Sequence, residues 1–245
     1  MEQQEAAERL SRIETHWTAV FRAHGSVADA AQEARNRLML QYSAAVYRYL
    51  LGALRDPDAA ADLCQDFALR FLRGDFHRAV PARGRFRDYV KSALINLVND
   101  FHRSRQARPG PLAIDAPDPH AGDPALPSDD DFLGGWRAAL LDQTWKALAA
   151  TNAAFHAVLL LRIENPDMQS PEMAERASKQ LDRPMTPENV RKSLQRAHAR
   201  FAELLLDQVE ESLDNPAPGD LEAELEALDL LRYCRTAVEK RKTRD

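Results

Sequence analysis

The side chains of this sequence best suited to chemistry are basic ones, gathered between Phe67 and Arg108. Arginine and lysine neutralise phosphate groups, so a dense basic window favours nucleic-acid binding. The whole chain is acidic, with a formal net charge of -5, but a binding surface depends on local rather than net charge. Acids in the window are limited to Asp75, Asp88 and Asp100. The basic residues are Arg70, Arg73, Arg78, Arg83, Arg85, Arg87, Lys91, Arg103, Arg105 and Arg108.

Residues 85–103 are predicted to form a helix with two unlike sides. Apolar residues recur at i, i+3, i+4 and i+7, and we expect the aromatic side chains among them to be core. The opposite side carries a polar ridge that includes Ser92 and His102. Asn and Ser side chains can hydrogen-bond the edges of unstacked bases, while Arg and Lys hold the backbone. The candidate single-strand-binding residues are Arg83, Arg85, Arg87, Lys91, Asn96, Asn99 and Arg103.

A second basic surface follows a predicted helix-turn-helix. Ser170-Pro171 and Thr186-Pro187 each give an N-cap followed by proline at the first helical position, and residues 182–185 form the turn between two helices. Basic side chains at the start of the second helix could reach base edges in a major groove, although a basic helical face can also be simply solvated. The candidate duplex-binding residues are Thr186, Asn189, Arg191, Lys192, Gln195, Arg196 and Arg200.

The sequence offers no constellation for catalysis, so we predict that the protein is not an enzyme and needs no cofactor or metal. Its seven histidines never take a metal-ligand spacing, and the chain has no Gly-rich phosphate loop. His156 lies on an apolar helical pattern and is expected to be a core residue. The acidic run of residues 129–131 is expected to be solvated.

Composition and periodicity predict an all-α fold of two small helical domains joined by a flexible acidic linker. Helix-forming residues dominate and we find no convincing strand. Cys64 and Cys234 each fall in a helical pattern, which argues against a disulfide framework. The chain has no basic, apolar leader and no apolar run near the ~18 residues of a membrane span. We therefore expect a cytoplasmic protein without membrane contact.

The predicted domain boundaries follow the distribution of proline and charge. Residues 1–108 form the first domain, whose second helix is expected to be capped by Asp58. Residues 109–131, with six Pro, six Asp and no Lys or Arg, form the linker. The second domain covers residues 132–214. A C-terminal acidic helical extension covers residues 215–245, and it could either pack on the second domain through its leucines or fold back on the basic recognition helix and restrain it.

This order of elements resembles an extracytoplasmic-function (ECF) alternative sigma factor of bacterial RNA polymerase. Asp62-Leu63-Cys64-Gln65 is similar to the family's Asp-Leu-x-Gln docking motif. Phe86-Arg87-x-Tyr89-Val90, with the polar residues that follow it, resembles the family's promoter-melting pattern, and residues 190–198 resemble its minus-thirty-five recognition helix. The closest likeness is to a planctomycete-like subgroup, with similar motifs at residues 15–18, 81–87 and 233–235.

The resemblance implies a region 2-like domain, a region 4-like domain and a defined set of partners. These are core RNA polymerase, through its β′ clamp and β flap, promoter DNA, and an anti-sigma factor or other regulator, whose existence stays open. The family usually has acids where this chain has Ala59 and Ala61, which should weaken docking without abolishing it. The implied polymerase-docking residues are Asp62, Leu63, Gln65 and Asp66.

Two other functions remain compatible with the sequence. The chain could be a stand-alone helix-turn-helix transcriptional regulator, its first domain serving as an interaction module. It could also be an adaptor that sequesters polymerase or another sigma factor, in which case Arg191 and Arg196 would not matter for activity. Duplex binding without polymerase would favour the regulator.

Overall fold

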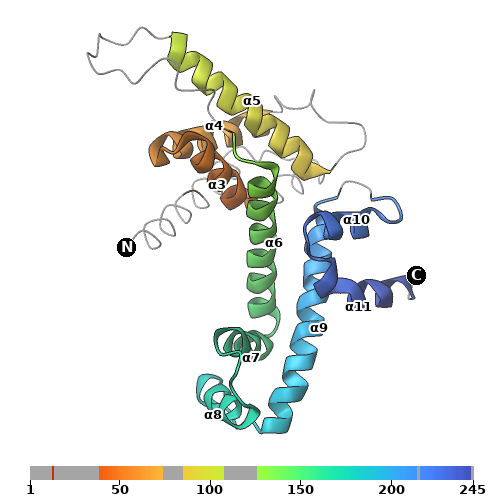
Figure 1. The fold of residues 1–245 in the computed structure, drawn as a ribbon. Coiled ribbons are helices and arrows are strands. Elements are labelled where there is room, and N and C mark those ends of the chain that lie inside the picture. Colours follow the sequence, from red (N-terminus) through yellow and green to blue (C-terminus); the bar gives the residue numbers. More distant parts are fainter. Residues whose placement is uncertain (1–12, 14–38, 74–84, 108–125, 214–215, 244–245) are drawn as a thin grey trace. The chain divides into compact units, whose positions relative to one another are not determined.

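The computed structural model describes residue 13 and residues 39–73, 85–107, 126–213 and 216–243, and all regular secondary structure in these ranges is α-helical (Figure 1). The predicted all-α fold is confirmed. The chain divides into two compact units, residues 1–139 and 140–245. Arg83 and most of the predicted linker lie outside the described residues. None of the helices in the described part has the length and apolar character that crossing a membrane requires.

The first unit begins with two helices that meet at a sharp corner. Helix α3 (Ser43–Leu54) ends because Arg55 adopts a left-handed conformation (φ 51°), and the Arg55 N–H donates to the carbonyl of Leu51. Helix α4 (Pro57–Arg73) starts with proline at its first position. Asp56, not the predicted Asp58, caps it, since its carboxylate accepts from the N–H groups of Asp58 (3.0 Å) and Ala59 (3.1 Å).

Helix α5 (Phe86–Ala107) packs against both α3 and α4 through one apolar stripe. Val90, Leu94, Leu97 and Val98 are buried at the predicted helical spacing. Phe86, Tyr89 and Phe101 are half-buried rather than fully enclosed. The stripe fixes the rotation of α5 about its axis, so the side chains on the opposite side must face outward.

An aromatic cluster completes the core of the first unit, and part of it comes from beyond the predicted domain. The indole of Trp136 stacks on Tyr42, with ring centroids 3.6 Å apart and planes 5° apart. Phe132 meets Tyr49 edge-on at 5.7 Å. Both partners belong to helix α6 (Asp129–Thr151), whose residues up to 139 lie in the first unit. The second unit therefore starts near residue 140, whereas the sequence placed a domain start at residue 132.

Helix α6 begins inside the segment expected to be linker, for a clear local reason. The Oγ of Ser128 accepts from the N–H of Asp131 (3.1 Å), and the Asp131 carboxylate accepts in return from the Ser128 N–H (3.1 Å) and hydroxyl (2.8 Å). This reciprocal capping satisfies the free donors of the first turn. The three acids of residues 129–131 also lie at the positive end of the helix dipole. The run expected to be solvated linker is thus a helix start.

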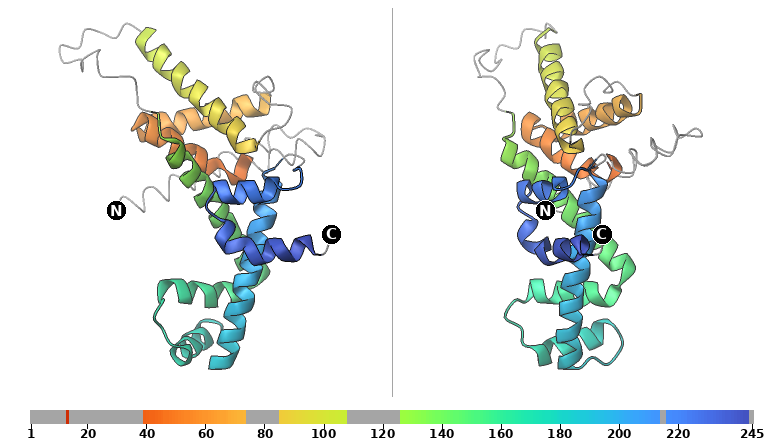
Figure 2. Two further views of the ribbon diagram at one scale, coloured as in Figure 1. Left: turned by 45° about the vertical axis from the view of Figure 1, so that its right-hand side comes forward. Right: turned by 90° about the vertical axis from the view of Figure 1, so that its right-hand side faces the viewer.

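The second unit contains the predicted pair of helices and its supports (Figure 2). Helices α7 (Ala153–Glu164), α8 (Ser170–Gln180) and α9 (Pro187–Glu211) pack on one another. One core cluster joins them through Val158, Met173, Ala177 and Val190. A second cluster joins the end of α6 to α7 and α9, and there Trp145 lies 4.8 Å from the ring of Phe201. His156 is half-buried with its ring 5.6 Å from Trp145.

The C-terminal extension consists of two helices instead of one. Helix α10 (Asp220–Ala227) stops before Asp229, whose left-handed backbone (φ 54°) turns the chain into α11 (Leu231–Lys242). Leu225, Leu228 and Leu230 are buried, and both helices contact α9. Packing through the leucines is therefore what the structure shows. Residues 239–242 belong to α11.

The Trp136–Tyr42 stack gives a stability prediction that can be localised to one unit. Trp136→Ala should lower the local opening free energy of α3–α5 by about 3–5 kcal/mol, because it removes a fully buried indole. Hydrogen exchange resolved by peptide measures this directly. The matched change in the second unit, Trp145→Ala, should leave α3–α5 protected and loosen α7–α9. Unchanged exchange in α3–α5 after Trp136→Ala would contradict the assignment of α6 to this core.

Candidate nucleic-acid interface

The outward side of α5 is a continuous polar ridge. Spacings of four, four, three and four residues separate its members, so they fall on one side of the helix, opposite the buried stripe. We call this set the α5 ridge. All of its side chains are exposed. Its members are Asp88, Ser92, Asn96, Asn99 and Arg103.

Three of the predicted single-strand-binding residues belong to the α5 ridge, and the others lie elsewhere. Asn96, Asn99 and Arg103 are on it, and Arg103 pairs with Asp100 at 3.2 Å. Arg87 is only 6 % exposed. Its Nε lies 3.9 Å from the carboxylate of Asp88, and its burial does not fit the surface contact that was predicted for it. Arg85 is half-buried beside the start of the helix.

Lys91 is held by a partner that the sequence did not suggest. Its ammonium lies 2.5 Å from the carboxylate of Asp129, the first residue of α6. The Lys91 side chain is 23 % exposed and that of Asp129 is 80 % exposed, so the pair lies at the surface and is open to solvent on the Asp129 side. Its two residues are 38 positions apart, so the local spacing of residues in the sequence could not predict this ion pair.

The outer side of α4 presents most of the predicted docking residues. Asp62 and Gln65 are exposed, and Asp66 is half-exposed in a 2.9 Å ion pair with Arg70, one turn away. Leu63 is only 8 % exposed and belongs to the core. Leu63 therefore supports the docking surface from beneath, which corrects its predicted place on it.

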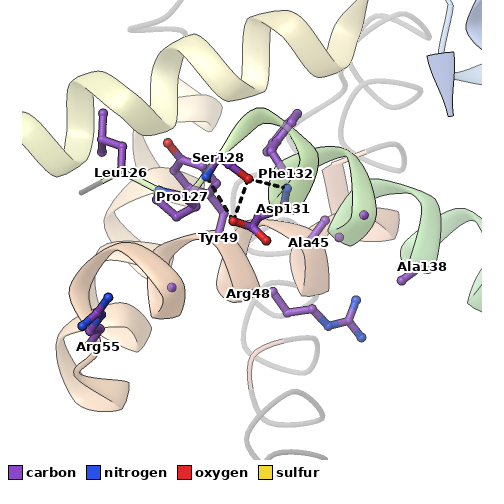
Figure 3. Close-up of a pocket in the computed structure, with 13 residues that line it drawn as sticks. Ala45, Arg48, Tyr49, Arg55, Leu126, Pro127, Ser128, Asp131, Phe132 and Ala138 are labelled. Carbon is purple, nitrogen blue, oxygen red and sulfur yellow. Dashed lines mark hydrogen bonds between the residues drawn. The ribbon is translucent and has the colours of Figure 1, made fainter. Parts of the chain in front are cut away.

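A cavity of about 640 Å³ lies in the first unit between α3 and the start of α6 (Figure 3). Arg48 and Arg55 line it from α3, and the Ser128–Asp131 cap lines it from the other side. Burial, together with the charge of Asp129, raises the pKa of the Tyr49 phenol at its wall. Asp131 is engaged by Ser128, as the dashed lines in Figure 3 show. The Ser128 hydroxyl and the Asp131 carboxylate serve here as the cap of α6.

Helices α8 and α9 of the second unit form a helix-turn-helix whose turn is pinned. The hydroxyl of Ser178 accepts from the backbone N–H of Met185 (2.8 Å), and it also donates to the carbonyl of Ala174 (2.6 Å). Asp182 takes the left-handed conformation (φ 48°) that reverses the chain. The start of α9 is thus held in a defined place relative to α8.

The first turns of α9 expose nearly all of the predicted duplex-binding residues. Thr186 caps the helix, its hydroxyl accepting from the N–H of Asn189 (3.2 Å). Lys192 pairs with Glu188 one turn earlier at 2.7 Å. Arg200 is half-buried and pairs with Glu203, so it is the least available of the set. The exposed members are Thr186, Asn189, Arg191, Lys192, Gln195 and Arg196.

Sequence analysis missed a third basic surface, on α11. Arg232, Tyr233, Arg235 and Lys240 are exposed there. The signal was present as four basic residues between positions 232 and 241, but it was hidden inside a segment treated as acidic. Cys234 on the same helix is buried, and burial raises the pKa of its thiol to about 11.

The comparisons with known proteins bear on the first unit. Residues 38–108 match the family model of sigma-70 region 2. The matched segment covers α3, α4 and α5, with the docking side of α4 and the α5 ridge, and ends before the second unit. The chain matches no curated protein and no solved structure. Helices α3–α5 therefore form a sigma-70 region 2 domain, which supports a place for the chain among the sigma factors and implies that it binds RNA polymerase and takes part in promoter melting.

Proposed function

We propose that this protein is an ECF-type sigma factor of the planctomycete-like subgroup, which binds core RNA polymerase and directs it to specific promoters. The observation that carries the proposal is the combination of a sigma-70 region 2 match at residues 38–108 with an exposed helix-turn-helix in the second unit. In this proposal the protein has no catalysis of its own. The first unit is region 2-like and the second is region 4-like.

Docking on the β′ clamp is assigned to the exposed side of α4. Asp62, Gln65 and Asp66 present an acidic and amide surface that suits basic clamp helices. Leu63 contributes by packing and not by contact. Ala59 and Ala61 are half-buried at the edge of this surface, where the resemblance to the family leads us to expect acids. Each lost exposed ion pair should reduce the free energy of binding to polymerase by about 0.2–1 kcal/mol. The docking surface is therefore weakened, but its other residues remain.

Capture of the melted minus-ten strand is assigned to the α5 ridge. The two asparagine side chains can both donate to and accept from base edges, and Arg103 can neutralise a phosphate. This assignment is supported by the exposure of Asn96, Asn99 and Arg103 along one side of α5, whose rotation is set by its buried stripe. Lys91, engaged with Asp129, would contribute only if that pair opens.

Recognition of the minus-thirty-five element is assigned to the start of α9. A helix presents its first turns to base edges when it enters a major groove. Arg191 and Arg196 carry planar guanidinium groups that suit bidentate contact with guanine, and Gln195 suits adenine. The second unit would also contact the β flap, and the acidic segment before it would follow the basic RNA-exit path.

The proposal predicts that the protein binds core polymerase, and that acids introduced at positions 59 and 61 strengthen this binding. Immobilised protein should retain core RNA polymerase, scored by its β′ subunit. Ala59→Asp/Ala61→Glu should strengthen retention by about 0.2–1 kcal/mol per restored pair, while Asp62→Arg should weaken it. Asp167→Arg, an equal charge change at an exposed site of the second unit, is the matched control. Failure of the wild type to retain polymerase, together with tight duplex binding alone, would favour the stand-alone regulator.

The α5 ridge predicts a defect in promoter opening that is separate from docking. Asn96→Ala/Asn99→Ala should remove hydrogen bonds worth about 0.5–1.5 kcal/mol each and lower open-complex yield accordingly. Permanganate footprinting of the melted strand measures the yield, and β′ retention should not change. Ser104→Ala is the control, because it is exposed on α5 but off the ridge. Equal defects in both variants would argue against strand capture by the ridge.

The α9 surface predicts a change in promoter choice. Arg191→Ala/Arg196→Ala should remove about 1–3 kcal/mol of base discrimination for each lost bidentate contact. Sequencing of run-off transcripts from a library of templates should then show relaxed preference upstream, with the minus-ten preference kept. Lys146→Ala, an exposed change on α6 in the same unit, should have no effect on template choice. An unchanged profile in the double variant would favour the adaptor role.

A further inference from the structure

The α11 basic face consists of Arg232, Tyr233, Arg235 and Lys240. Tyr233 is 62 % exposed, and the guanidinium of Arg232 lies 4.7 Å from the centre of its ring while also pairing with Asp229 at 3.1 Å. Arg235 and Lys240 are exposed. Stacking on an aromatic ring orients a guanidinium without neutralising it. Glu239 is exposed on the same side of α11, so the three cations of the face exceed its two acids, Asp229 and Glu239, by one charge. The face combines this positive charge with an aromatic platform, in a chain whose net charge is -5.

The inner side of α11 fixes which way this face points. Cys234, Ala237 and Val238 are buried against the unit. Arg241 bridges two acids of α9, reaching Glu210 at 2.7 Å and also Asp207. Anchored by apolar contact along its length and ion pairs at its end, α11 turns the basic face to solvent.

The hairpin of α10 and α11 packs beside the recognition side of α9. Residues 191, 195, 202, 206 and 209 of α9 follow one another at spacings of three, four or seven, so they share one side of the helix. At the first two of these positions Arg191 and Gln195 are exposed, whereas the last three are buried. Helices α7 and α8 lie at the first half of α9, and α10 and α11 at its second half (Figure 1). At 1.5 Å rise per residue, position 206 lies about 16 Å beyond position 195.

The hairpin also changes the charge of this side. Without α11, Asp207 and Glu210 would present carboxylates next to the basic start of α9 and would repel phosphate. Arg241 pairs with both and offsets one of their two negative charges, and α11 then offers Arg235 and Lys240 outward. The acidic second half of α9 is thereby partly neutralised and covered by a helix that exposes two further cations.

The acids of α10 leave the recognition residues uncovered, although one of them, Glu226, is exposed. Glu222 pairs with Lys242, and Glu224 is buried. Arg191, Lys192 and Arg196 remain exposed with the hairpin in place. The fold-back hypothesis requires these acids to lie on the recognition residues, so this arrangement favours an accessory role over a restraint.

We propose that the α11 basic face binds the phosphate backbone of duplex DNA flanking the site read by α9. The inference rests on the proposed duplex recognition by α9. The contact adds affinity without sequence preference, because phosphates carry no base identity.

The test uses the full chain and a mixed-sequence duplex about 30 base pairs long, roughly three helical turns. It measures weak, sequence-independent binding at low salt, which is distinct from the tight binding that would favour the stand-alone regulator. Arg235→Glu/Lys240→Glu is the test variant, and Arg48→Glu/Lys146→Glu is the control with the same change in net charge at exposed sites elsewhere. Affinity is measured over a series of salt concentrations. The test variant should bind several-fold more weakly at low salt, and its log–log salt slope should flatten by about 1.8 for two lost phosphate contacts. The control should match the wild type.

Each alternative outcome has a definite meaning. Wild-type affinity and slope in the α11 variant would overturn the proposal, as would an equal loss in the control. If duplex binding is kept but retention of core polymerase falls, the face binds a protein and the proposal is wrong. The variant Arg191→Ala/Arg196→Ala distinguishes failure of the proposed α9 recognition from failure of the α11 contact. If this variant binds duplex normally while the α11 variant does not, α9 does not recognise duplex, whereas the α11 contact is supported.

Discussion

The functional surfaces of this protein depend on one constraint, the burial of a single apolar stripe on each amphipathic helix. Val90, Leu94 and Leu97 set the rotation of α5, and Val190 and Ala197 do the same for the first half of α9. Because a helix turns by about 100° per residue, a fixed inner stripe also fixes which side chains face outward. The α5 ridge and the start of α9 are therefore consequences of core packing.

Much of this could be predicted from the sequence, because the signals are local. Proline at the first position of α4 and α9, the cap by Thr186 and the spacing of the α5 stripe all lie within a few residues of one another. Helix ends and exposed sides follow from such signals. The split of the C-terminal extension was not predicted. It depends on the left-handed backbone of Asp229, and an aspartate in an amphipathic pattern does not by itself indicate that the helix ends there.

The errors at the candidate site have a different cause. Leu63 and Arg87 sit within functional motifs, yet both are buried, because a motif records residues needed for folding as well as for contact. The Lys91–Asp129 pair and the Trp136–Tyr42 stack join positions far apart along the chain. Spacing along a sequence carries no information about such partners. A linker boundary drawn from composition alone consequently missed the part of α6 that completes the first unit.

Helix α6 contributes one tryptophan to each of the two units, which has a consequence for the fluorescence of the protein. Trp136 is enclosed in the first unit beside Tyr42, and Trp145 lies in the second beside Phe201 and His156. Among the described residues, each unit thus holds one indole, in a different environment. With Trp17 also replaced by phenylalanine, replacing either of these two indoles leaves the emission of the other as a reporter of its own unit, so domain-specific events on polymerase or DNA become visible without an attached dye.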